Sequence, residues 1–346
     1  MKRRTLLSAA APAILNAASK SGSKRPILGS GDDTYEAIHD WGELPPGLRY
    51  GNTHGVVEDS QGRIYIAHTV HSSSEHQDTL VVFDDKGKHI RSWGANFKGG
   101  AHGLHLRKEG REEFLYFADT GKGRPGGGIS AKHASMIKMT LAGEEVLRIG
   151  YPKEAPGYQP DGSTKFSPTN VAVAPNGDIY LADGYGSYFI NQYDARGRFL
   201  RSFGGNGKDA GQLACPHGLM VDTRSAEPYL LVADRTNNRL QRFTLGGRHL
   251  GFGSGVNLPC HFHERKGVVV APDLAARVTL LGRENQVIAH LGEDTTGDWQ
   301  ELRKKPRNEF RPGKFVSPHG ACFDHAGNIF VVEWVEVGRV TKLKRV

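Results

Sequence analysis

One stretch decides the fold: residues 216–243 read PHGLMVDTRSAEPYLLVADRTNNRLQRF. The stretch opens with His217-Gly218, continues into a short apolar strand and a turn, and then contains a second strand rich in apolar residues. A third strand begins at Arg239. Short strands that follow one another with turn residues between them indicate antiparallel neighbours in an all-β fold.

The same pattern occurs six times along the chain. The six opening residues are His54, His102, Asn170, His217, His261 and His319, at intervals of 44 to 68 residues. Second strands are expected at residues 64–67 and 179–182, a third strand at 339–343, and a fourth strand that ends in glycine at 199–204. Four strands in a repeat of about 40 to 50 residues are typical of a propeller blade. No connection has the periodicity of a long helix, which disfavours a parallel βαβ fold. We therefore predict a six-bladed β-propeller.

The last repeat has only three strands before the sequence ends at Val346. Residues 37–42 have the same Trp-Gly ending as the fourth strand at 91–94. Pairing this N-terminal strand with the last blade would close the ring and cover an open sheet edge. We predict one propeller domain over residues 35–346, preceded by a linker over residues 20–34.

Residues 1–19 have the features of an export signal. Lys2, Arg3 and Arg4 precede an apolar run over residues 6–18 and small residues that include Ser19. This order resembles a twin-arginine signal with cleavage near Ser19, so we expect a periplasmic or secreted protein. The apolar run is too short for a stable membrane span.

Composition limits the classes of partner. The chain has 38 % hydrophobic residues, 24 % charged residues and 45 glycines, which suits a soluble globular protein with many turns. Its formal charge of +8 falls to +5 without residues 1–19, which gives no reason to expect nucleic acid. The three cysteines, Cys215, Cys260 and Cys322, cannot form a closed disulfide framework. We expect a monomer with buried free thiols, each within three residues of an opening histidine, so that a role near a metal stays open.

Strand direction places the functional residues on one face. In antiparallel blades the start of strand one and the end of strand two lie at the same end of the sheet, here named the histidine face. Four long insertions fall at the same end: residues 70–79, 120–134, 151–167 and 293–316. Loops gathered at one end of a compact scaffold usually bind something there. The histidine-rich run of His68, His71 and His76 is expected to be a solvated loop on this face, or else to deliver a mobile ligand.

Three of the six opening residues suggest a metal site. His102, His217 and His319 open alternate blades, which lie about 120° apart in a six-fold ring. Three imidazoles can then meet on the axis and leave one coordination position open, as in catalytic zinc sites. Zinc is the first expectation, with copper, iron or nickel as alternatives. A lone histidine in a repeat would more simply bond within its own blade. The other three opening residues are expected to form hydrogen bonds to the metal ligands or to line the central channel. They are His54, Asn170 and His261.

The third and fourth repeats resemble the peptidyl-α-hydroxyglycine α-amidating lyases, zinc lyases with an NHL-repeat propeller. The matching segments, all within residues 165–245, are 167–173, 182–185, 211–213, 216–219 and 232–235. The resemblance implies zinc on His102, His217 and His319. It also implies a catalytic tyrosine at Tyr185 and a substrate-carboxylate arginine at Arg235.

The sequence departs from that family at three positions. Thr69 stands near the place of the family's second arginine, Gly320 at that of its acidic calcium ligand, and Ser317 at that of a methionine. The missing arginine argues against the family's carboxylate-bearing substrate, and the missing acid argues against a structural calcium.

The predicted function is metal-dependent, lyase-like C–N bond cleavage, or related chemistry, on a small hydroxylated or peptide-like substrate. One alternative is a noncatalytic propeller that binds a protein, peptide or glycan on the histidine face, because fold alone assigns no reaction. A lactonase-like hydrolase is the third candidate, although such sites favour oxygen ligands to calcium.

Overall fold

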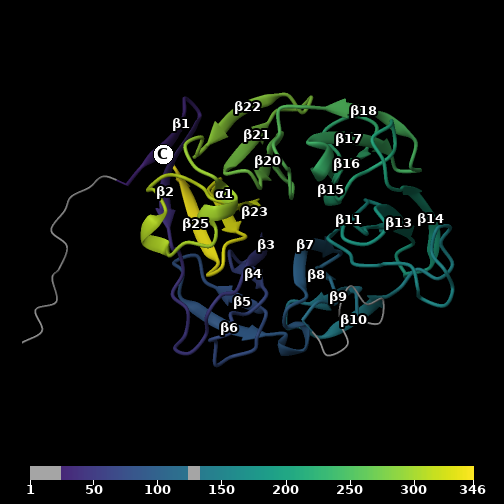
Figure 1. Cartoon of the computed structure of the whole chain (residues 1–346), viewed down its shortest axis with the longest axis horizontal. Coiled ribbons are helices and arrows are strands. Elements are labelled where there is room, and N and C mark those ends of the chain that lie inside the picture. The colour runs from purple at the N-terminus through teal and green to yellow at the C-terminus, as the bar shows by residue number, and fades with distance from the viewer. Residues whose placement is uncertain (1–24, 124–132) are drawn as a thin grey trace, which may run out of the picture.

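The computed structural model describes residues 25–123 and 133–346. The expected export signal lies outside the described residues. Six antiparallel sheets stand around a common centre, which confirms the all-β six-bladed propeller (Figure 1). None of the helices in the described ranges is long and apolar enough to cross a membrane.

Five sheets contain four strands each, in the order of the sequence. The first contains β3 (Thr53–Glu58), β4 (Ile64–His68), β5 (Leu80–Phe83) and β6 (His89–Trp93). The second contains β7 (Ala101–Glu109), β8 (Glu112–Asp119), β9 (Ser135–Thr140) and β10 (Glu145–Ile149). The third contains β11 (Asn170–Val173), β12 (Ile179–Ala182), β13 (Phe189–Tyr193) and β14 (Phe199–Gly204). The fourth contains β15 (Pro216–Asp222), β16 (Tyr229–Asp234), β17 (Arg239–Thr244) and β18 (His249–Gly253). The fifth contains β19 (His263–Arg265), β20 (Val268–Asp273), β21 (Arg277–Leu281) and β22 (Val287–Leu291).

The sixth sheet joins both ends of the described chain. Its C-terminal strands are β23 (Pro318–Phe323), β24 (Ile329–Glu333) and β25 (Arg339–Arg345). They are followed across the sheet by the N-terminal strands β2 (Asp33–His39) and β1 (Ile27–Ser30). β2 pairs antiparallel with β25, with Ala37 opposite Leu343.

Two boundaries differ from the sequence expectation. The N-terminal strand ends at His39, because Asp40 has a positive φ of 54° and turns the chain out of the sheet. Trp41 instead packs edge-on against Phe330, with ring centroids 4.6 Å apart. Residues 27–34, expected as part of a linker, form β1 and the start of β2.

Three second strands end in a buried acid that pairs with an arginine opening the next strand. Asp234 and Arg239 lie 2.6 Å apart, and Asp273 and Arg277 lie 2.8 Å apart. Glu333 pairs with Arg339 in the same way, and neither side chain is more than 2 % exposed. These buried pairs hold the chain at the histidine face, where the residue after each acid enters a connecting loop.

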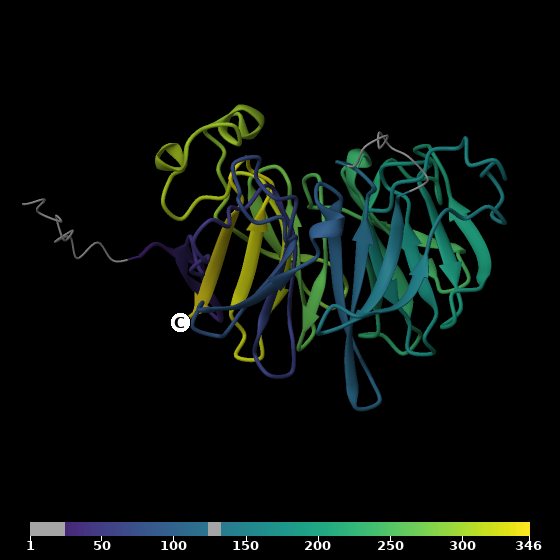
Figure 2. The same cartoon turned by 90° about the horizontal axis from the view of Figure 1, so that it is seen from below.

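The histidine face carries the largest insertion. Figure 2 shows the segment with α1 (Trp299–Leu302) and η3 (Arg307–Glu309) rising on one side of the ring, opposite the protruding turn between β7 and β8. Two short helical turns, η1 (Ala95–Phe97) and η2 (Arg235–Asn237), also lie in connections. The propeller is therefore a ring of six sheets with its longest loops at one end.

Candidate metal centre

Four imidazoles meet where the innermost strands converge. His54, His102, His217 and His319 are each between 1 and 6 % exposed. The ring centroids of His102, His217 and His319 lie 4.9, 4.8 and 4.7 Å from one another, so these three rings form a nearly equilateral triangle. The structure thus brings together the histidines of the three alternate blades.

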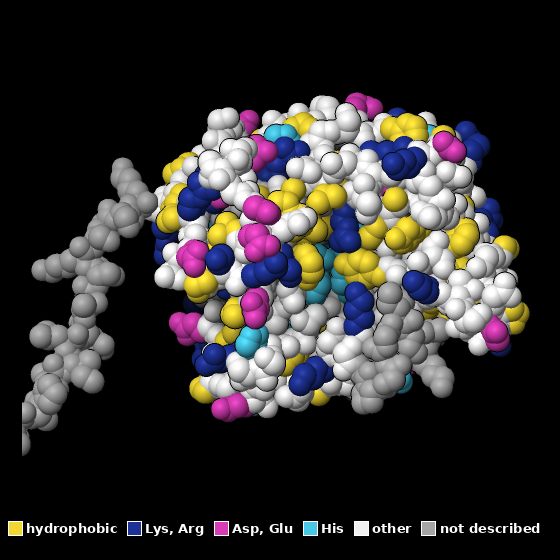
Figure 3. Space-filling view, viewed as in Figure 1, with side chains coloured by type: hydrophobic (Ala, Val, Ile, Leu, Met, Phe, Trp, Pro, Cys, Tyr) yellow, Lys and Arg dark blue, Asp and Glu magenta, His cyan; other side chains and the backbone are white. Residues whose placement is uncertain are grey.

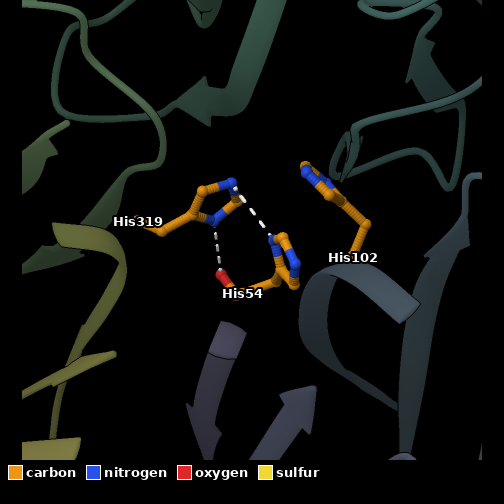
Figure 4. Close-up of side chains that lie close together, drawn as sticks. All are labelled: His54, His102 and His319. Carbon is orange, nitrogen blue, oxygen red and sulfur yellow. Dashed lines mark hydrogen bonds between the residues drawn. The ribbon is translucent and has the colours of Figure 1, made fainter. Parts of the chain in front are cut away.

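His54 is as close to this cluster as the expected ligands are. Its ring centroid lies 4.6 Å from that of His102 and 4.5 Å from that of His319 (Figure 4). The described residues contain two groups of potential metal ligands, and within each group all the ligand atoms lie within 4.8 Å of one another. One group is His54, His102 and His319, and the other is His217, Cys260 and His319. His319 belongs to both.

The three alternate-blade histidines are fixed by the same interaction. Each places Nδ1 against a backbone carbonyl at the start of the neighbouring blade, so Nδ1 must carry the proton and donate it. The distances are 2.6 Å from His102 to Thr169, 2.9 Å from His217 to Cys260, and 2.9 Å from His319 to His54. Nε2 is then left unprotonated, which is the usual arrangement of a metal-binding histidine. The sequence also allowed each histidine to form a hydrogen bond within its own blade, but all three bond to the neighbouring blade instead.

The glycine after each of these histidines makes the anchor possible. A Cβ atom at Gly103, Gly218 or Gly320 would lie 2.4, 2.7 or 2.5 Å from the very carbonyl oxygen that accepts the imidazole proton. Only a residue without a side chain allows that carbonyl to approach. The His-Gly pairs are therefore a packing requirement, and position 320 has no room for an acidic calcium ligand.

Replacing Gly320 by alanine is expected to push His319 away from His54 and to cost roughly 1–3 kcal/mol of stability, as overpacking does. Thermal unfolding followed by circular dichroism measures the loss. Gly150→Ala is the matched control, because no atom lies within 4 Å of the added Cβ and the backbone is not left-handed. Equal melting temperatures for the two variants would contradict this account.

Tyr185 and Arg235, both expected from the sequence, lie beside the cluster. The Tyr185 hydroxyl is 3.1 Å from Nε2 of His102 and 3.0 Å from Nε2 of His217. The hydroxyl has one proton for these two acceptor nitrogens, so it can donate to only one of them at a time. Arg235 donates to the same hydroxyl at 3.4 Å and to the Cys215 sulfur at 3.2 Å.

Burial sets the charge states of these groups. It lowers the pKa of His102 and His217 well below the ordinary value, and that of His319 to about 3. The imidazoles are therefore neutral at pH 7, as metal ligands must be. Burial also raises the pKa of Tyr185 to about 12, and the positive charge of Arg235 opposes this shift.

A cavity of about 300 Å³ leads to the cluster from the histidine face. Its lining includes His54, His102, Thr69, Lys122 and Tyr185. Figure 3 shows histidine side chains at the floor of a central hollow, with Lys and Arg side chains around it. Lys122 places a positive charge in the lining of the cavity, which suits an anionic or strongly polar ligand.

The sequence did not point to two cations on this face. Lys122 lies with its ammonium group 4.4 Å from the centre of the Tyr185 ring. Arg303 lies over the Trp334 ring at 3.3 Å and donates to Asn52 at 3.2 Å. Both come from long insertions, where neither periodicity nor a motif indicates which side chain turns inward.

The remaining expected residues lie outside both ligand groups. Asn170 is buried, and its amide oxygen accepts from the Val171 backbone at 2.8 Å. His261 is buried, and its Nδ1 has no partner within the described residues. Both line the inner wall of the propeller without joining the cluster.

The expectation of a solvated histidine loop was wrong for His68. This residue ends β4 and is completely buried, and its Nδ1 accepts from the Val70 backbone at 3.1 Å. It occupies the position where Asp119 and Asp234 end their strands, so the strand continues one residue further than expected. His71 is half-buried and His76 is exposed in the loop that follows.

The fold and the cluster define a class: six-bladed propellers whose axis carries converging imidazoles. The chain is similar in sequence to peptidyl-α-hydroxyglycine α-amidating lyase 2 of Drosophila melanogaster, with 28 % identity over 276 residues. That match covers 78 % of this chain and 60 % of the fly protein. Peptidyl-glycine α-amidating monooxygenase B of Xenopus laevis is 29 % identical over 177 residues, which cover 47 % of this chain and 17 % of the frog protein. The chain thus spans less than two thirds of either relative.

A solved structure supports the fold alone. A gluconolactonase of Xanthomonas campestris superposes with a TM-score of 0.59 at 13 % identity, covering 92 % of this chain and 95 % of that one. No model of a known protein family matches the sequence. The resemblance to the amidating lyases therefore comes from the sequence relatives, and the support for the propeller comes from the solved structure.

Proposed function

We propose that this chain is a metal-dependent propeller enzyme that cleaves a C–N bond in a small hydroxylated substrate, in the manner of the amidating lyases. One observation carries the proposal. Imidazoles from three alternate blades, each anchored through Nδ1, lie with their ring centroids within 4.9 Å of one another, and Nε2 of His102 and His217 lies beside the Tyr185 hydroxyl. The sequence relatives named for this chemistry support it.

The cluster fits a divalent transition metal. His102, His217 and His319 would hold it, and their neutral nitrogen donors suit zinc better than calcium or magnesium. A bound metal would supply Lewis-acid polarisation of a substrate oxygen. Neither ligand group contains a carboxylate, which disfavours a calcium-dependent lactonase as the function.

The chain's own residues would bind and orient the substrate. The Tyr185 hydroxyl lies within 3.1 Å of two imidazole nitrogens, where it can exchange a proton with a substrate hydroxyl held in the cavity. Arg235 faces the same space and would pair with a substrate carboxylate through two parallel hydrogen bonds. Lys122 adds positive charge on the side where Thr69 stands in place of the family's second arginine.

The setting of the enzyme is part of the proposal. The twin-arginine-type signal over residues 1–19 would export the folded protein to the periplasm or beyond. The substrate would be a small or peptide-like molecule that enters at the histidine face, and the protein would act as a monomer. A noncatalytic propeller that captures a protein, peptide or glycan on this face is the competing function.

Two measurements test the function together. Elemental analysis of the purified protein is expected to find a divalent transition metal, and incubation with an α-hydroxyglycine peptide is expected to release glyoxylate. Metal without glyoxylate release would exclude the narrow amidating reaction. Absence of both would leave the noncatalytic propeller as the better account.

A further inference from the structure

Cys260 lies beside two of the histidines in the cluster. Its side chain is 1 % exposed, and its sulfur belongs to the group of ligand atoms, with His217 and His319, that lie within 4.8 Å of one another. Its contact with the Leu258 carbonyl is long, at 3.5 Å. The thiol is therefore held near two imidazole nitrogens, and the Arg235 guanidinium also interacts with its sulfur.

The backbone of Cys260 fixes this placement. Its carbonyl accepts the Nδ1 proton of His217 at 2.9 Å, and its amide donates to Pro272 at 2.9 Å. The preceding turn is sharp, since Leu258 has a positive φ of 57°. One residue thus orients His217 through its carbonyl and presents a sulfur atom to the same space.

Charge balance gives an independent reason for a sulfur ligand. The imidazoles are neutral, the two ligand groups contain no carboxylate, and the cations Arg235 and Lys122 both lie against Tyr185. A negatively charged ligand would stabilise a buried dication in such surroundings. A thiolate at Cys260 would supply one in direct contact.

The other two cysteines lack this placement. Cys215 accepts a hydrogen bond from Arg235 at 3.2 Å and belongs to neither ligand group. Cys322 packs in the hydrophobic core between blades six and one, with Phe330 and Val56. The chain therefore provides two buried cysteines as matched controls.

We propose that Cys260 binds the metal through its thiolate, together with His217 and His319, in the place that the proposed function gives to His102, so that the centre has mixed nitrogen and sulfur ligands. On binding, the sulfur–metal bond forms and the thiol proton passes to solvent. Thiolate ligation would favour zinc over harder cations such as magnesium and calcium. The inference rests on the proposed function only in requiring that a metal binds.

Cobalt substitution reports the ligand directly. Full-length protein is freed of metal with a chelator and titrated with Co²⁺, and a thiolate-to-cobalt charge-transfer band is expected in the near-ultraviolet. The band should disappear in Cys260→Ser and persist in Cys215→Ala and Cys322→Ala. Cys260→Ser should also weaken metal binding by at least the roughly 10- to 100-fold that loss of an outer partner causes.

X-ray absorption of the zinc-loaded wild-type protein gives a second measurement, which does not depend on whether a variant folds. A sulfur shell at about 2.3 Å is expected beside nitrogen at about 2.0–2.1 Å. Bound metal with nitrogen ligands alone, or a charge-transfer band that survives in Cys260→Ser, would overturn the assignment and leave the proposed function intact. Failure of the protein to bind cobalt or zinc at all would overturn both.

Discussion

Replacing His319 by alanine is expected to remove the metal from the propeller. His319 is the one residue that both ligand groups contain, and its Nδ1 anchor to His54 links the last blade to the first. A zinc site contributes roughly 10–16 kcal/mol through about four ligands, so one lost ligand costs about 3 kcal/mol, or about a hundredfold in affinity. Loss of the hydrogen bond from His319 to the His54 carbonyl adds to this loss of metal affinity.

Metal content after dialysis against a weak chelator measures the effect, with circular dichroism to establish that the variant is folded. His261→Ala is the matched control, because His261 is an equally buried opening histidine that belongs to neither ligand group. The site would have to be placed elsewhere if folded His319→Ala kept its metal, or if His261→Ala lost it to the same extent.

The second large effect is expected for Tyr185→Phe. This change removes only the hydroxyl that lies between His102 and His217, so the metal should stay bound and KM should change little. If the hydroxyl transfers a proton in the reaction, kcat should fall by roughly 10²- to 10⁴-fold. Steady-state kinetics on an α-hydroxyglycine peptide, with metal content measured in parallel, separates the two quantities.

Tyr151→Phe provides the comparison for this variant. Tyr151 lies in the insertion over residues 151–167, and its hydroxyl donates to the Gln159 carbonyl at 2.8 Å. Its removal deletes a tyrosine hydroxyl from a loop without touching the cluster. A Tyr185→Phe enzyme with unchanged kcat would show that the hydroxyl takes no part in proton transfer.

The fold could be predicted because blade strands are local and repetitive. A four-residue apolar run between turns located β12, and a fourth strand that ends in glycine located β14, both at their observed bounds. The N-terminal strand was expected to begin four residues and to end three residues too late, because its Trp-Gly ending resembles that of 91–94 while Asp40 adopts a left-handed conformation. A backbone angle of that kind has no reliable signature in a single sequence.

Strand order predicted which histidines come together, but not how they are held. Alternate openings meet on the axis, so His102, His217 and His319 followed from counting blades. The inward rotation of His54 and the approach of Cys260 depend on side-chain direction and on neighbouring carbonyls, which repeat spacing does not specify. The cations contributed by long loops were missed for the same reason.

The carbonyl anchors of the three histidines have a consequence for assembly. Each anchor crosses a boundary between blades, and the one from His319 reaches back to His54, across most of the polypeptide. The proposed metal site is therefore complete only when all six blades are in place. A chain that lacks its final blade would have neither His319 nor the carbonyl bond that orients it, so we expect the proposed metal to bind late in maturation.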